Sequence, residues 1–285
     1  MSAAAEKTIA VRNRTIARKV KGMPTEDGAG VKLTRLVGSP YLPDVDPFLM
    51  LDTFRSDNPK DYIAGFPEHP HRGFETVSYM IKGSIAHRDN HGGQGLVTDG
   101  GVQWMTAGRG VAHSEMPAQT DGQMFGFQLW INLQAAEKMR EPWYADIPAA
   151  AIPEFRVGAA TVKLVAGEWN GHAGPAPDRS TEPFLADIRL AANAGADIPL
   201  PDGHAGFIYV FEGELRVEGE RVGAGEVGVL SDGGALSVSA LEAGARFLVV
   251  AGKPIGEPVA KYGPFVMNTQ DEIRRAIHDY QSGRF

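Results

Sequence analysis

Hydrophobic and polar positions along the chain alternate with the two-residue period of β-strands. The clearest example is residues 124–132, MFGFQLWIN, whose large apolar side chains share one face while Gln128 and Asn132 lie on the other. That apolar face comprises Phe125, Phe127, Leu129 and Ile131. The continuous apolar runs at 206–211 and 247–250 have the length and composition of buried strands. Many short strands favour a sandwich or a barrel.

Turn residues and one helix signature complete the predicted elements. The chain contains 35 glycines and 19 prolines, which is typical of short strands joined by turns. One segment near the end has a helical period, and it begins with a capping box formed by Thr269 and Glu272. The apolar face of this helix is Ile273, Ile277 and Tyr280. The pattern therefore predicts an all-β fold that ends in a short α-helix.

An internal repeat relates the two halves of the chain. The segments YMIKGSI (79–85) and YVFEGEL (209–215) share a tyrosine, a glycine and a branched aliphatic residue at an offset of 130. The segments VQWMTAGRG (102–110) and VGVLSDGGA (227–235) align at an offset of 125, as if a loop in the second copy were five residues shorter. Two copies of one barrel account for both alignments.

The ionisable residues of the first copy do not recur in the second. A segment of prolines and small residues, 145–155, separates the copies, so we expect one barrel in 1–150 and another in 151–285. At the two offsets, polar residues of the first copy face apolar ones: His69, His71 and Glu75 face Pro199, Pro201 and Ala205, and His113 and Glu115 face Val238 and Ala240. We therefore expect a functional site in the first barrel only.

Composition and charge exclude several classes of protein. The chain has no cysteine, so disulfides and thiolate metal ligands are excluded. It has neither an apolar run long enough for a membrane span nor an apolar N-terminal signal segment, so we expect a cytoplasmic protein without membrane contact. The net charge of −7 argues against direct binding to nucleic acid. One basic cluster, expected to be a solvated strand face rather than a phosphate site, consists of Arg12, Arg14, Arg18, Lys19 and Lys21.

Two close-spaced motifs in the first half indicate a metal site. Residues two or four apart on a strand point the same way, so His69, His71 and Glu75 can share a face, as can His113 and Glu115. Three imidazoles and one carboxylate suit Fe(II), Mn, Cu, Ni or Zn, and four protein ligands leave a six-coordinate ion open to substrate. Spacing alone leaves the fourth ligand open between Glu75 and Glu115.

Three long motifs, HPHRGFETVSYM, GGVQWMTAGRGVAHSEMP and GPFVMNTQDEI, together resemble the pirin family of the cupin superfamily. The resemblance covers nearly the whole chain from DPFLMLDTF at 46–54 onward. It implies a bicupin, two tandem antiparallel β-barrels with a metal in the N-terminal barrel only. It also implies that the metal ligands are His69, His71, His113 and Glu115. The ion that it implies is Fe(II), with Mn, Ni, Cu, Co or Zn as alternatives.

The resemblance implies two alternative functions. The first is a dioxygenase similar to quercetin 2,3-dioxygenases, which open a flavonol ring with O2; Glu115 is then the general base. Aromatic and thioether side chains expected to line its apolar slot are Phe66, Phe74, Trp104 and Met105. The second is a non-enzymatic regulator, in which the state of the metal alters a surface for a protein partner and the basic cluster contributes to that surface. The resemblance also implies a monomer.

Overall fold

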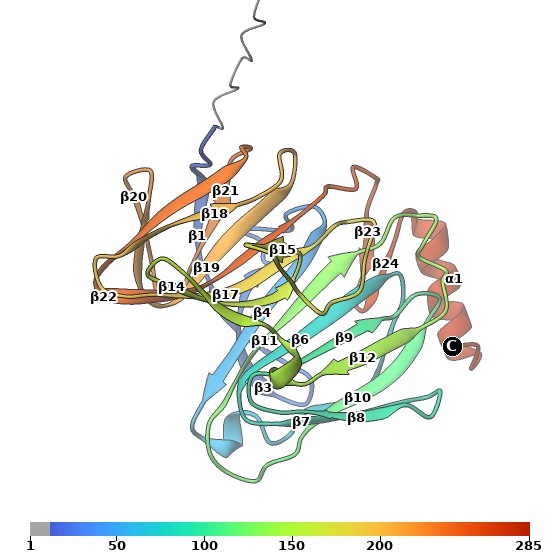
Figure 1. Ribbon diagram of the computed structural model, residues 1–285. Helices are drawn as coiled ribbons and strands as arrows, with labels where there is room; N and C mark the ends of the chain where they lie inside the picture. The colour runs from blue at the N-terminus through green and yellow to red at the C-terminus, as the bar shows by residue number, and fades with distance from the viewer. Residues whose placement is uncertain (1–11) are drawn as a thin grey trace, which may run out of the picture.

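The computed structural model describes residues 12–285, which form two β-barrels with a helix against the outside of the first barrel (Figure 1). The elements of the first barrel are β2 (Met23–Asp27), β3 (Val31–Val37), β4 (Phe48–Ser56), the 3-10 helix η1 (Pro59–Asp61), β5 (Phe66–His71), β6 (Phe74–Lys82), β7 (Ile85–Asp89), β8 (Gln94–Val97), β9 (Val102–Thr106), β10 (Val111–Pro117), β11 (Met124–Asn132) and β12 (Trp143–Ile147). A seven-stranded sheet, in the order β12-β9-β6-β11-β4-β3-β2, packs against a four-stranded sheet, in the order β5-β10-β7-β8.

The second barrel is built from one nine-stranded sheet that folds over on itself, together with a separate two-stranded sheet. Its elements are the 3-10 helix η2 (Ala149–Ala151), β13 (Glu154–Val157), β14 (Ala160–Ala166), β15 (Glu168–Trp169), β16 (His172–Ala173), β17 (Phe184–Leu190), β18 (Gly195–Pro199), β19 (Ala205–Val217), β20 (Glu220–Gly223), β21 (Glu226–Leu230) and β22 (Ala235–Gly252), joined by β1 (Ile16–Lys21). The long strands β19 and β22 bend where Gly213 and Gly244 adopt positive φ angles of 71° and 72°. A side chain at Gly213 would collide with the facing backbone, so glycine is required there.

The predicted elements are confirmed. The alternating segment 124–132 is β11, and the two apolar runs lie inside β19 and β22. The helix α1 (Gln270–Gln281) begins with the capping box of Thr269 and Glu272. None of the helices in residues 12–285 is long and apolar enough to span a membrane.

Strand register confirms the internal repeat. Tyr79 pairs with Val102 in the first barrel, and Tyr209 pairs with Val227 in the second, as the two offsets require. The counterparts assigned to the histidines at the offset of 130 were wrong, however. Strand β10 pairs with β5 as β22 pairs with β18. In that register the counterparts of His69 and His71 are Ala196 and Ile198, rather than Pro199 and Pro201.

Apolar residues from both barrels form one shared core between them. Tyr79, Phe127 and Leu129 of the first barrel are buried with Tyr209 and Leu248 of the second in a single cluster. A separate cluster fills the interior of the second barrel with aliphatic and aromatic side chains. The interior of the first barrel has a smaller apolar cluster, which leaves room for polar groups.

Both ends of the described chain cross to the opposite barrel. Strand β1 pairs with β21 of the second barrel, whereas β23 (Ala260–Tyr262), β24 (Phe265–Met267) and α1 lie against the first. The backbone of Arg72 bonds to that of Pro264 and Val266, and the buried ammonium of Lys138 donates to the carbonyls of Gly73 and Val266 at 2.7 and 3.1 Å. The domain boundary at residue 150 stays a prediction. Both ends of the described chain make contacts with the barrel on the other side of that boundary.

A buried polar network also joins the barrels. Asp187 on β17 accepts two bonds from the Arg246 guanidinium, at 3.0 and 2.7 Å, and one from the Tyr79 hydroxyl at 2.8 Å. Tyr209 lies on the opposite side of the same contact, where it lines one surface pocket together with Thr53 on β4. Since β4 and β17 hold the same place in their sheets, each repeated tyrosine reaches the equivalent strand of the other barrel.

We expect Asp187→Ala to lower the free energy of unfolding by about 3 kcal/mol, because it leaves Arg246 and the Tyr79 hydroxyl without their buried partner. Urea denaturation measures the change. Asp197→Ala, at an exposed position of the neighbouring β18, is the control and should shift stability by less than about 0.5 kcal/mol. Equal effects of the two substitutions would contradict a role for the network in joining the barrels.

Candidate metal centre

Strands β5 and β10 bring three histidines together. They are antiparallel neighbours, and His113 lies directly opposite His69. Strand β5 is at the edge of its sheet, which is where a strand tolerates prolines such as Pro67 and Pro70. His69 and His71 therefore keep the two-residue spacing that turns both imidazoles toward the same side.

The three imidazoles form a compact cluster. One nitrogen of each of His69, His71 and His113 lies within 4.8 Å of the other two. The Nδ1 of His69 lies 2.8 Å from the carbonyl oxygen of Pro67, which places the proton on Nδ1 and leaves a lone pair on Nε2. That Nε2 is 3.1 Å from the Nε2 of His113. Two nitrogen ligands at right angles, each about 2.1 Å from an ion, stand about 3 Å apart, so the pair fits a shared metal.

Burial keeps two of the imidazoles neutral. It lowers the pKa of His71, and the neighbouring His113 and His69 lower it further. Burial likewise lowers the pKa of His113 to about 4. A neutral imidazole is the form that binds a metal ion, so the environment prepares these side chains as ligands.

Glu115 lies next to the cluster but is held by other groups. Its carboxylate is buried and accepts hydrogen bonds from the Ser78 hydroxyl at 3.1 Å and the Gln128 amide at 2.9 Å. It does not belong to the cluster of three nitrogens. Glu115 as the fourth ligand therefore stays a prediction. Its two hydrogen bonds hold the carboxylate in a fixed position beside the histidines.

Glu75 points away from the histidines, into the contact between the barrels. It accepts bonds from the Thr106 hydroxyl at 2.5 Å and from Arg179 of the second half at 2.6 Å. The expectation that Glu75 could share a face with the histidines was wrong, because a turn at Gly73, with φ of 89°, separates β5 from β6 and resets the alternation. Glu75 instead shares the face of Val77, which lies in the core between the barrels.

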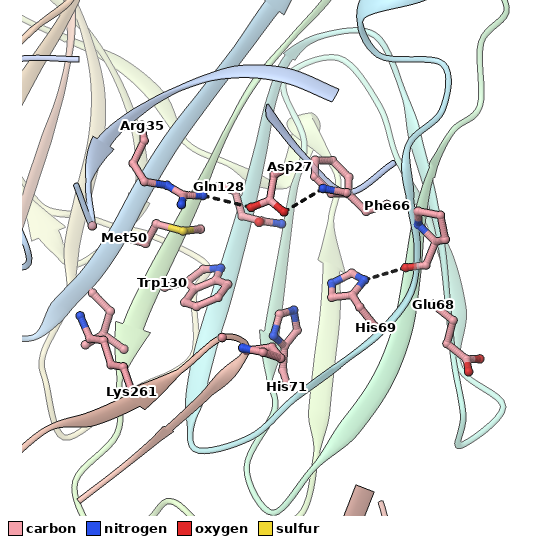
Figure 2. A pocket seen from close by; sticks show the side chains of 16 residues that line it. Asp27, Arg35, Met50, Phe66, Glu68, His69, His71, Gln128, Trp130 and Lys261 are labelled. Carbon is pink, nitrogen blue, oxygen red and sulfur yellow. Dashed lines mark hydrogen bonds and ion pairs between the residues drawn. The ribbon is translucent and has the colours of Figure 1, made fainter. Parts of the chain in front are cut away.

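A cavity of about 590 Å³ opens onto His69 and His71 (Figure 2). Its remaining lining residues are Asp27, Gly28, Arg35, Gly38, Leu49, Met50, Phe66, Pro67, Glu68, Gln128, Trp130, Lys261, Gly263 and Pro264. The walls are therefore largely apolar, and the C-terminal segment supplies one side. Such a cavity has the size and lining of a small-molecule site.

Only one of the four side chains expected to line the slot does so. Phe66 lines the cavity, whereas Phe74 packs behind His71 with ring centroids 5.1 Å apart. Trp104 is buried in the core between the barrels, and Met105 lines a different cavity. Trp130 was missed, although strand alternation places it on the same face as Gln128.

The overall architecture matches a solved structure along nearly its whole length. The crystal structure of a quercetin 2,3-dioxygenase from Acinetobacter baumannii has a TM-score of 0.89 at 32% identity and covers 96% of this chain and 99% of its own. Two barrels in tandem, with a histidine cluster inside the first, define a bicupin with a candidate metal centre.

Sequence relatives specify the family. The Pirin model matches residues 30–131, and the Pirin C-terminal cupin domain matches residues 185–285. The chain belongs to the pirin family. A Pseudomonas aeruginosa protein that carries the provisional name quercetin 2,3-dioxygenase is 49% identical over 280 residues, which is 95% of this chain and 98% of that protein. A pirin-like protein of Caulobacter vibrioides is 46% identical over 274 residues, 95% of this chain and 99% of its own.

We expect Glu115→Gln to weaken metal binding and Glu75→Gln to leave most of the metal in place, because only Glu115 stands beside the histidines. His71→Ala, which removes a member of the cluster, should lose the metal. Metal content by elemental analysis and affinity by calorimetry measure both effects. Loss of metal from Glu75→Gln but not from Glu115→Gln would show that the wrong carboxylate was assigned.

Gln128→Leu should lower metal affinity about tenfold, because Glu115 loses the amide that orients it. Gln103→Leu is the control: Gln103 is buried and lies on a strand of the same sheet, but its amide donates to Asp146 rather than to Glu115. Competition with a chromogenic chelator measures both affinities. An equal loss in the two variants would indicate general damage to the barrel.

Proposed function

We propose that this protein is a metal-dependent dioxygenase that opens the ring of a flavonol-type substrate with O2, with His69, His71, His113 and Glu115 as metal ligands. The observation that carries the proposal is the open cavity of about 590 Å³ whose wall includes two of the histidines. A catalytic metal needs such access, whereas a structural one is closed by its ligands. The names of the Pseudomonas aeruginosa and Acinetobacter baumannii relatives support the substrate class.

The residues of the site suit proton transfer from a flavonol hydroxyl. A divalent ion held by the histidines, Fe(II) in our proposal, supplies positive charge that stabilises a deprotonated oxygen. Glu115 accepts the proton as general base, while Ser78 and Gln128 hold its two oxygens in place. Phe66 and Trp130 offer apolar faces against which flat rings can lie.

The basic cluster gives little support to the alternative of a regulatory surface. Arg14 is buried, and its guanidinium bonds to backbone carbonyls of the second barrel. Arg12 pairs with Asp232 at 2.7 Å, and Lys19 lies 3.8 Å from Glu220. The expectation of a solvated face was thus wrong for Arg14, and Arg12 and Lys19 each have an acidic neighbour.

Anaerobic reconstitution with Fe(II), Mn, Ni, Cu, Co or Zn tests the proposal. With at least one ion we expect loss of quercetin, uptake of oxygen and release of carbon monoxide, all abolished by His71→Ala. Absence of turnover with every ion, at a stoichiometrically filled site, would reject the dioxygenase and favour the regulatory alternative, for which a pull-down of protein partners is the next experiment.

A further inference from the structure

The cavity above the histidines has four charged residues in its wall: Asp27, Arg35, Glu68 and Lys261. Two are acids and two are bases, so their formal charges cancel. What a ligand meets depends on which of them already have partners within the protein, because a charge that is fully hydrogen-bonded internally has little left to offer.

Two of these charges are held by partners within the protein, and the carboxylate of the third points away from the histidines. Arg35 donates to both oxygens of Asp52, at 3.0 and 2.7 Å, and to Asp27 at 3.0 Å. Asp27 also accepts the backbone N–H of Gly28 at 2.8 Å. Glu68 is exposed, and Figure 2 shows its carboxylate directed away from the histidines.

Lys261 is the exception. Its ammonium lies 3.4 Å from the carbonyl of Pro43 and 3.8 Å from Asp44, both longer than an ordinary charge-assisted hydrogen bond. Asp44 is itself about half exposed, so solvent screens the pair. The side chain of Lys261 is about a third exposed, and its partial burial lowers its pKa while Asp44 raises it in part.

Lys261 and the two histidines border the same cavity from different strands. In Figure 2, the indole of Trp130 lies between Lys261 on one side and His69 on the other, with Met50 beside it. A flat ring system that places one end at the histidines can lie along this apolar wall and direct its other end to the ammonium.

We propose that the cavity selects flat aromatic substrates that carry an anionic oxygen group at the end remote from the metal, and that Lys261 is the residue that binds this group. The inference rests on the proposed function, since it takes the histidines as the reacting end of the site. Lys261 is a specificity-determining residue here and takes no part in the chemistry at the metal.

Direct binding to the zinc-loaded full-length chain under anaerobic conditions tests this inference without turnover. The probes are a flavonol with a sulfate ester on its outer phenyl ring and the methyl ether of the same hydroxyl, which both leave the 3-hydroxyl free. We expect the sulfate to bind more tightly than the ether, and Lys261→Met to weaken binding of the sulfate about fivefold while the ether changes by less than twofold. Quenching of tryptophan fluorescence and calorimetry provide the dissociation constants.

Two further variants separate charge from structure. Lys261→Arg should retain the preference for the sulfate, and Lys253→Met, which removes a lysine outside the cavity, should leave both ligands unaffected. No binding of either ligand, or an equal change in both with Lys261→Met, overturns the inference. Selective binding without turnover with any metal supports it while rejecting the dioxygenase; turnover without preference for the anion rejects the inference alone.

Discussion

The alternation of side chains along β6 and β11 is the constraint on which the rest of the structure depends. Along β11, Phe127 and Leu129 lie in the core between the barrels, while Gln128 and Trp130 line the cavity of the first barrel. A slip of one residue would exchange these two sets and place an amide in the apolar core. Packing between the barrels therefore also fixes the direction of the side chains that surround the histidines.

The second barrel keeps the strands of the first and fills its own interior. In the shared register, the positions of Ser78 and Gln128, whose side chains hold Glu115, are occupied by Ile208 and Val249. These aliphatic side chains belong to the dense interior cluster of the second barrel. With aliphatic residues at these positions, the second barrel has no side chains to hold a buried carboxylate like Glu115. Its interior is instead closely packed. The apolar barrel then supports its polar neighbour through the core that they share.

Local patterns made much of this predictable from sequence. The alternation of apolar and polar side chains in residues 124–132 predicted β11. The two-residue spacing of His69 and His71, and of His113 and Glu115, identified the histidines of the cluster. The orientation of Glu75 could not be derived in the same way, because the turn at Gly73 interrupts the period on which the argument relied. Lys261 lies far from the histidines in sequence and reaches the cavity only through the return of the chain across both barrels, which no local pattern encodes.

The wall formed by Lys261 and Pro264 has a consequence for the order of events during synthesis. Strands β5 and β10, which carry the histidines, leave the ribosome well before this wall does. The strands of the second barrel from β13 to β22 are synthesised between them. The side of the cavity that these residues form is therefore the last part of the site to be made.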